Sequence, residues 1–124
     1  MNHTEKRLQE AKDNVYPGWW PILDKYIPQI LAIAPECELE VKEKFGLLRI
    51  TAYGESLDFD RLNPLERAAE KESADVCEIC GEPGKLRPKQ SWIQTLCDRC
   101  AAMGSSERAR LGWETTERLK ENDL

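Results

Sequence analysis

Apolar residues follow a helical period in the first third of the chain. From Trp19 to Leu31 they recur every three to four positions, as expected for a helix with one buried face. Pro21 suits the first turn of such a helix, whereas Pro28 would remove a backbone donor from its interior. The pattern therefore predicts either a kinked helix or two short helices that meet at Pro28, with an end at Pro35.

The next two segments alternate with a period of two. Residues 37–42 alternate apolar and charged side chains, and residues 47–53 place Leu48, Ile50 and Ala52 on one face. This is the pattern of strands with one buried side. A short link that ends in glycine predicts a hairpin. Because a two-stranded hairpin is not stable alone in water, we expect its apolar face to pack on the preceding helix.

Two more helices are predicted before the cysteine-rich region. Residues 1–14 form a polar lead-in with too few apolar side chains to bury a large surface. Further on, Asn63 followed by Pro64 and Glu66 matches a helix start, with asparagine as the cap and proline at the first helical position. The second helix is therefore expected over residues 64–75, on the surface of the body.

A last helix is predicted over residues 107–121, capped by the serines at 105 and 106. Its apolar side chains Leu111, Trp113 and Leu119 are the expected anchors. Gly112 lies in the middle of this helix and should cost about 1 kcal/mol relative to alanine. The helix is therefore expected to be broken or loosely held.

Four cysteines form two Cys-x-x-Cys pairs, with sixteen residues between Cys80 and Cys97. This spacing is typical of a four-cysteine zinc site, completed by Cys77 and Cys100. Such sites are usually tetrahedral and closed, and they stabilise a fold without performing chemistry. Residues 91–96 resemble a strand that leads into the second pair. Residues 77–100 are therefore predicted to form a zinc ribbon.

Other roles of these cysteines are less favoured. Two disulfides would suit an exported protein, and a redox role would use a single Cys-x-x-Cys pair in a βαβ frame. A catalytic metal needs an open position and a nearby base. The one histidine of the chain is His3, near the N-terminus and far in sequence from the cysteines. The fifth cysteine, Cys37, alternates with strand residues and lies between Glu36 and Glu38, which favours a buried, unreactive thiol. We therefore predict a protein that is not an enzyme.

Length and composition fit one small domain of the α+β class. The chain has 124 residues, of which 40% are hydrophobic and 33% charged. No apolar run approaches the roughly 20 residues of a membrane span, and the first residues lead into no signal region, so a cytoplasmic location is expected. The predicted units are the lead-in 1–15, an α/β body 16–76, the zinc ribbon 77–100, and a C-terminal helix with a frayed tail over 101–124.

The net charge is −5 and is concentrated in the body. Residues 1–76 carry ten Lys and Arg against fifteen Asp and Glu, whereas residues 77–100 carry four against three. An acidic surface suits a basic protein partner through electrostatic steering. Recognition of nucleic acid normally requires a clear excess of basic residues.

Two groups of residues are candidates for contact with a partner. The adjacent Trp19 and Trp20 either both enter the core or leave one ring exposed to a partner. The basic residues of the ribbon, together with its tryptophan, could contact phosphate groups and stack on a base. Alternatively, these residues belong to an ordinary solvated loop that binds nothing. The members of this second group are Lys85, Arg87, Lys89 and Trp92.

The chain resembles a family of small, uncharacterised zinc-ribbon proteins of phages, prophages and bacteria. The resemblance covers residues 17–100. Its motifs are Gly18-Trp19-Trp20-Pro21-Ile22, Lys42-Glu43-Lys44-Phe45-Gly46 with its flanking residues, Ala69-Glu70 to Ser73, Cys77-Glu78-Ile79-Cys80-Gly81-Glu82-Pro83-Gly84 and Trp92-Ile93-Gln94-Thr95-Leu96-Cys97. Leu47 departs from the pattern, where a second glycine is common. The resemblance implies a phage or bacterial setting and a zinc ribbon on an α/β body, and it implies no catalytic residue.

These observations lead to one main prediction and one alternative. The main prediction is a zinc-stabilised cytoplasmic module that binds another protein. In the setting that the resemblance implies, it would be an inhibitor or immunity protein that acts on a basic nuclease or defence factor. The alternative is a regulator that contacts DNA or RNA through the ribbon. Neither predicted function requires a membrane.

Overall fold

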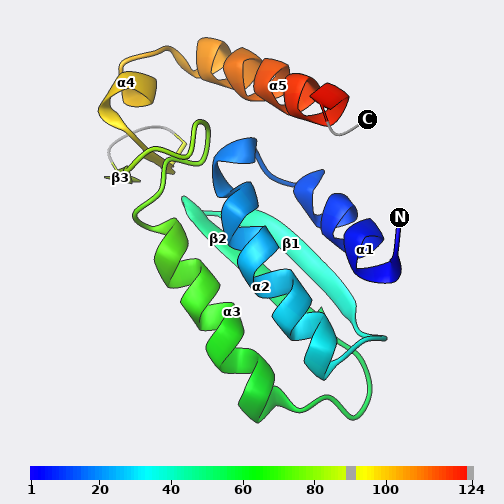
Figure 1. The fold of residues 1–124 in the computed structure, drawn as a ribbon. Coiled ribbons are helices and arrows are strands. Elements are labelled where there is room, and N and C mark those ends of the chain that lie inside the picture. Colours follow the sequence, from blue (N-terminus) through cyan, green and yellow to red (C-terminus); the bar gives the residue numbers. More distant parts are fainter. Residues whose placement is uncertain (89–91, 123–124) are drawn as a thin grey trace.

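The computed structural model describes residues 1–88 and 92–122 and has the predicted α+β architecture (Figure 1). In chain order its elements are α1 (His3–Lys12), the 3-10 turn η1 (Pro17–Trp19), α2 (Trp20–Ile33), β1 (Glu38–Lys44), β2 (Leu47–Tyr53), α3 (Phe59–Ser73), β3 (Lys85–Arg87), β4 (Gln94–Leu96), α4 (Asp98–Ala101) and α5 (Ser105–Asn122).

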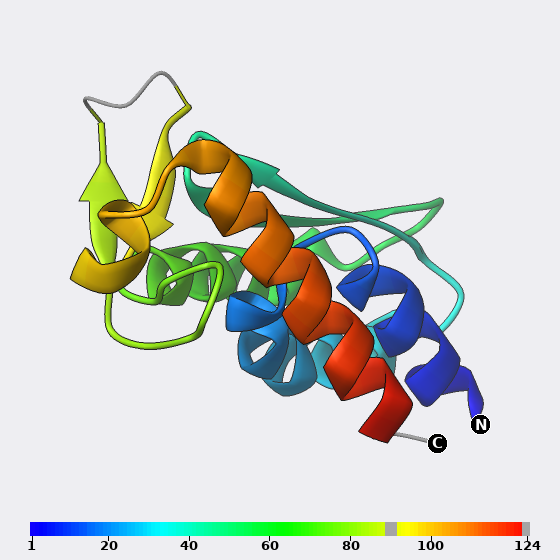
Figure 2. The same cartoon turned by 90° about the horizontal axis from the view of Figure 1, so that it is seen from above.

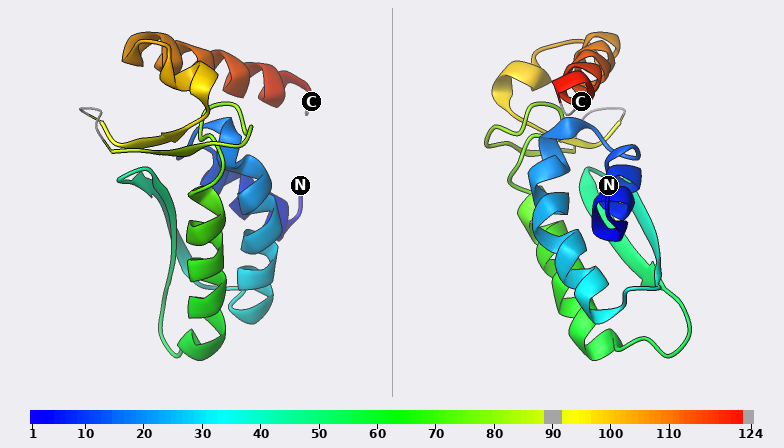
Figure 3. Two further views of the ribbon diagram at one scale, coloured as in Figure 1. Left: turned by 90° about the vertical axis from the view of Figure 1, so that its left-hand side faces the viewer. Right: turned by 45° about the vertical axis from the view of Figure 1, so that its right-hand side comes forward.

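The body consists of a β-hairpin covered by helices. In Figure 1 the helix α2 lies in front of the β1–β2 hairpin, with α3 along β2 on one side and α1 on the other. Their apolar side chains form one core, as the alternation in the strands predicts. The two views in Figure 3 show that α5 and the cysteine-containing segment lie together at one end of this body. The molecule therefore has a body and a smaller metal-site end.

Helix α2 is continuous through Pro28. Its neighbours Ile27 and Ile30 are completely buried, so core packing holds both halves of the helix in line. Proline leaves the carbonyl of Asp24, one turn earlier, without its usual donor. Asp24 is exposed, which lets water bond to that carbonyl. Of the two arrangements expected around Pro28, the break into two short helices is therefore not found.

The hairpin closes through two residues with positive φ. Phe45 has a φ of 54° and Gly46 a φ of 81°, and Lys44 pairs directly with Leu47. Two left-handed central residues are the geometry of a type I′ turn, which matches the twist of the flanking strands. Strand β1 thus runs two residues further than the alternation over 37–42 predicts. The tight turn makes the hairpin tip a defined feature next to the metal-site end.

The predicted start of the linking helix at Asn63 is wrong. Helix α3 begins at Phe59, and the side chain of Asp58 caps it by accepting a hydrogen bond from the Arg61 amide at 3.3 Å. Pro64 therefore lies inside the helix. Leu62 is completely buried in the core of the body, and this burial favours an earlier helix start than the local capping pattern at Asn63.

We expect the substitution Ser73→Ala to destabilise the body by about 1–3 kcal/mol. The Ser73 hydroxyl accepts a hydrogen bond from the Leu48 amide at 2.9 Å and donates one to the Glu70 carbonyl at 2.6 Å. Ser73 is completely buried, so alanine would leave the Leu48 amide unsatisfied. Urea denaturation measures the effect. The exposed Ser106→Ala is the control, and equal stability of the two variants would contradict the prediction.

Helix α5 begins at Ser105 and continues through Gly112, so of the two states expected for it the break is not found. It runs from the cysteine-containing segment across η1 (Figure 2). A Cβ at position 112 would lie 2.4 Å from the ring of Tyr16, so glycine permits the helix to approach this close. Trp113 is 64% exposed and Leu119 37%, so these two predicted anchors are wrong. The third anchor, Leu111, packs against the metal-site core.

Within the described residues, no helix combines the length and the apolar character that a membrane crossing requires.

Candidate metal centre and adjoining cleft

The fold brings the four predicted cysteine ligands together. The sulfurs of Cys77, Cys80, Cys97 and Cys100 all lie within 4.8 Å of one another. The Sγ atoms of Cys80 and Cys97 are 3.6 Å apart, much longer than the roughly 2.05 Å of a disulfide. A tetrahedral metal with sulfur bonds of about 2.3 Å, as for zinc, separates its ligands by about 3.8 Å. The cluster therefore has the donor type and the spacing for such an ion.

The first cysteine pair lies on a tight turn. The Gly81 amide donates to the Cys77 carbonyl at 2.9 Å, and Gly81 has a φ of 83°, which glycine adopts without strain. The Cys77 amide in turn donates to the Glu82 carbonyl at 2.8 Å. This turn directs the first two sulfurs to the same point, as the glycine after Cys80 suggests.

The second pair lies at the start of the short helix α4. Cys97 caps this helix, and its Sγ accepts a hydrogen bond from the Cys100 amide at 3.4 Å. Burial acts to raise the pKa of Cys97, but hydrogen bonds from the Cys100 amide and from neighbouring cysteines outweigh it and lower the pKa to about 7. The thiolate is the form of cysteine that binds a metal. A lowered pKa therefore favours Cys97 as a ligand.

Comparison of the chain with protein-family models, with curated proteins and with solved structures finds no match. The resemblance to phage and bacterial zinc-ribbon proteins, drawn from sequence motifs, stays a prediction.

A small core separate from that of the body surrounds the cysteines. Its buried members are Cys77, Ile79, Leu96, Cys97 and Cys100. Cysteines make up most of this set, so little apolar surface is available to hold the segment without a metal. Two-stranded pairing of β3 with β4 completes the unit. The observed strand β4 covers only the last half of the predicted segment 91–96.

Several hydrogen bonds join the metal-site end to the body. The Gly18 amide donates to the Glu78 carbonyl at 3.0 Å, and the Trp19 indole donates to the Val76 carbonyl at 2.9 Å. At the hairpin tip, the Thr95 hydroxyl donates to the Gly46 carbonyl at 2.6 Å. The turn η1 and the tip of the β1–β2 hairpin therefore position the cysteine segment.

The suggested exposure of a tryptophan ring at positions 19 and 20 is corrected by the structure. Trp19 is completely buried and Trp20 is 6% exposed. Trp20 donates from its indole nitrogen to the carbonyl of Lys12 at 3.1 Å, which fixes the end of α1 on α2. Both rings are thus part of the core, which was one of the two arrangements expected. Neither ring is available to a partner.

The basic residues predicted on the ribbon are not equivalent. Arg87 donates to the Leu96 carbonyl at 3.0 Å and to the Asp98 carboxylate at 2.8 Å, so it fastens β3 to the second cysteine pair. Lys85 is exposed. Lys89 lies outside the described residues, and Trp92 is 53% exposed. One of the predicted phosphate contacts is therefore already engaged within the protein.

Cys37 lies apart from the cluster and is 3% exposed, as predicted. Burial is the main cause that raises the pKa of its thiol. A buried thiol with a raised pKa is a poor nucleophile, in agreement with its assignment to the core.

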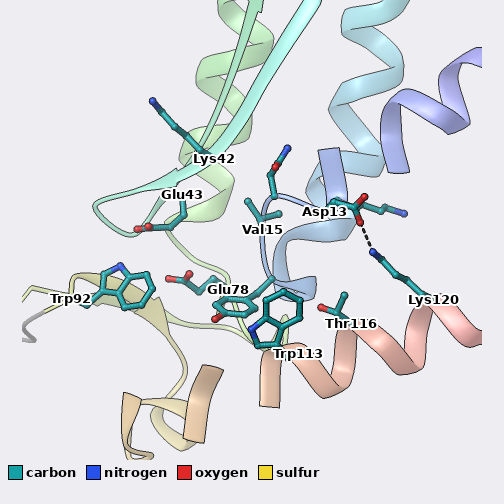
Figure 4. Close-up of a pocket in the computed structure, with 12 residues that line it drawn as sticks. Asp13, Val15, Lys42, Glu43, Glu78, Trp92, Trp113, Thr116 and Lys120 are labelled. Carbon is teal, nitrogen blue, oxygen red and sulfur yellow. Dashed lines mark hydrogen bonds and ion pairs between the residues drawn. The ribbon is translucent and has the colours of Figure 1, made fainter. Parts of the chain in front are cut away.

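A cleft adjoins the metal centre where the lead-in, the hairpin tip, the cysteine segment and α5 meet (Figure 4). Its volume is about 380 Å³. The side chains that line it include Tyr16, Lys42, Glu43, Glu78, Trp92, Trp113 and Lys120. Burial, and secondarily the charge of Glu43, raise the pKa of Glu78 to about 8. The sequence motifs do not single out this cleft, because its walls come from segments far apart in the chain.

We expect Arg108→Met to destabilise the metal-site end by about 2–3 kcal/mol. Arg108 is 6% exposed, and it donates to the Gln94 side chain at 3.2 Å and to the carbonyls of Cys100 and Met103. Methionine keeps the length of the side chain but leaves these acceptors unsatisfied. Thermal unfolding of the metal-loaded protein measures the loss. Arg110→Met, in an exposed i,i+4 pair, is the control, and an equally small effect of both would contradict the prediction.

Proposed function

We propose that this protein is a zinc-stabilised, non-catalytic module of the cytoplasm that binds a basic protein. The observation that carries the proposal is the closed set of four sulfurs. When all four bind one Zn²⁺, no position is left for a reactive water, so the metal supports the fold and does not perform chemistry. The binding role then falls to the surface of the body and the adjoining cleft.

Charge supports a basic partner. The chain carries a net charge of −5, and its two exposed tryptophans line the cleft together with carboxylates. Exposed tryptophan is enriched at the centres of protein interfaces. In the phage or mobile-element setting implied by the resemblance, the partner would be a nuclease or a defence factor, which this protein would inhibit.

Copurification separates this function from the nucleic-acid alternative. The tagged full-length protein is recovered from its host at low and high salt, and the bound proteins are identified by mass spectrometry. Labelled DNA and RNA are titrated in parallel. We expect a basic protein that is released as salt increases, and no binding of either nucleic acid at about 50 mM salt. A steep salt-dependent affinity for DNA or RNA, with no protein partner, would overturn the proposal.

A further inference from the structure

The cleft beside the metal centre contains aromatic rings from three separate segments. Tyr16 comes from the loop before η1, Trp92 from the segment before β4, and Trp113 from α5. Trp92 is 53% exposed and Trp113 64%. Figure 4 shows both indole rings at the opening, on either side of Glu78. The contact of Gly112 with the Tyr16 ring places the following Trp113 at this position.

Two glutamate side chains line the same space. In Figure 4 the side chain of Glu78 lies between the two indole rings, and that of Glu43 lies above Glu78 and Trp92. The Gly46 amide donates to Glu43 at 2.6 Å, whereas Glu78 accepts from the Thr95 amide at 3.2 Å and from the Gln94 side chain. Within residues 1–88 and 92–122, neither carboxylate forms an ion pair with lysine or arginine.

The lysines of the cleft, by contrast, are paired with other carboxylates. Lys42 lies 2.6 Å from Glu40, and Lys12 lies 2.9 Å from Asp24. Lys120 bonds to Asp13 at the far side of the opening, as Figure 4 shows. Glu78 is buried and lies near the positive charge of Arg108. The carboxylate of the cleft left without a cation is therefore that of Glu43, and it lies beside the aromatic rings.

We propose that this cleft binds an arginine side chain of a protein partner. A guanidinium group is planar, stacks on tryptophan and tyrosine, and donates paired hydrogen bonds to carboxylates. Tyr16, Trp92 and Trp113 supply the stacking surfaces, and Glu43 supplies the charged acceptor. The volume of about 380 Å³ is at the lower end of the range for organic ligands, which suits a single side chain.

This inference rests on the proposed function, because it names the surface that would receive a basic partner. The four tryptophans provide an internal control for its test. Trp92 and Trp113 lie at the cleft, whereas Trp19 and Trp20 are buried in the body. Their indole N–H resonances in ¹⁵N-labelled, zinc-loaded, full-length protein therefore report separately on the cleft and on the core.

The probe is N-acetyl-arginine methylamide, titrated into this protein and followed by NMR. We expect saturable shifts of the Trp92 and Trp113 indoles and unchanged Trp19 and Trp20 indoles. The citrulline analogue has a similar shape but no charge, and it should not produce saturable shifts. Equal responses to the two probes, or no response of the cleft indoles to arginine, would overturn the inference. Free guanidinium ion is titrated as well. If it bound as tightly as the arginine probe, the ligand would be a small free cation and the inference of an arginine side chain would be wrong.

Two substitutions test the assigned roles. Trp113→Ala and Glu43→Gln should each weaken arginine binding at least about fivefold, and glutamine can still accept the Gly46 hydrogen bond. Phe59→Ala removes an aromatic side chain that is 47% exposed at the start of α3, outside the cleft, and should have no effect. Unchanged affinity in Trp113→Ala and Glu43→Gln would contradict the inference. If these variants still bound a copurified basic protein normally, the proposed function would stand and only this cleft assignment would fail.

Discussion

Removal of the metal is expected to unfold residues 77–100 while the body keeps its structure. The metal-site core contains three of the four ligand cysteines, with Ile79 and Leu96 as its other buried members. Apparent zinc-binding free energies of small zinc domains reach about 10–16 kcal/mol, which exceeds what this small apolar set can supply. The core of the body is separate and includes no ligand cysteine. It should therefore survive chelation.

Amide hydrogen exchange after treatment with a chelator measures this effect. The Glu78 amide, which donates to the Thr95 carbonyl at 3.0 Å, should lose its protection. The Leu48 amide, bonded to Ser73, should keep most of its protection. Thermal stability that is unchanged by the chelator would contradict a structural role of the metal.

Single cysteine substitutions add a matched comparison. Cys97→Ser removes a ligand, whereas Cys37→Ser changes the same atom in the core of the body. In cobalt-substituted protein, the sulfur-to-metal absorption bands should indicate four sulfurs in the Cys37→Ser variant and fewer in the Cys97→Ser variant. Identical spectra of the two variants would show that Cys97 is not a ligand.

We expect Gly18→Ala to destabilise the protein by about 3 kcal/mol or more and to weaken metal binding. A Cβ at position 18 would lie 2.0 Å from the carbonyl oxygen of Cys77 and 2.5 Å from that of Glu78. Both are backbone atoms, so relief of the clash requires the first cysteine pair to move. Overpacking against backbone of this kind is at the upper end of the cost of single substitutions. The hydrogen bond from Gly18 to Glu78 would be lost as well.

The control is Gly104→Ala, because a Cβ at position 104 would have no neighbour within 4 Å. Chemical denaturation of the zinc-loaded protein gives the change in the free energy of unfolding, and competition with a chromophoric chelator gives the change in metal affinity. We expect Gly104→Ala to change both by little. A Gly18→Ala protein as stable as the Gly104→Ala protein would show that the body and the metal-site end can separate without cost.

Local sequence patterns were sufficient for much of the fold. The period-two alternation correctly placed Leu48, Ile50 and Ala52 on the buried face, because strand side chains alternate regardless of what covers them. The spacing of the cysteines predicted the cluster, since each Cys-x-x-Cys turn presents two sulfurs by itself. The start of α3 was missed because the cap at Asn63 is a local signal, whereas the burial of Leu62 depends on a distant core.

The sequence by itself determined the classes of the main helices and of the β1–β2 hairpin, the four-cysteine cluster and the buried position of Cys37. Only the tertiary structure decided which tryptophans are exposed. Trp19 and Trp20 are covered by the core, while Trp113 faces outward because Gly112 turns the inner side of α5 toward Tyr16. The physical reason is that exposure depends on which distant segment packs against a residue. The cleft, with walls from four separate segments, exists only once those segments have met.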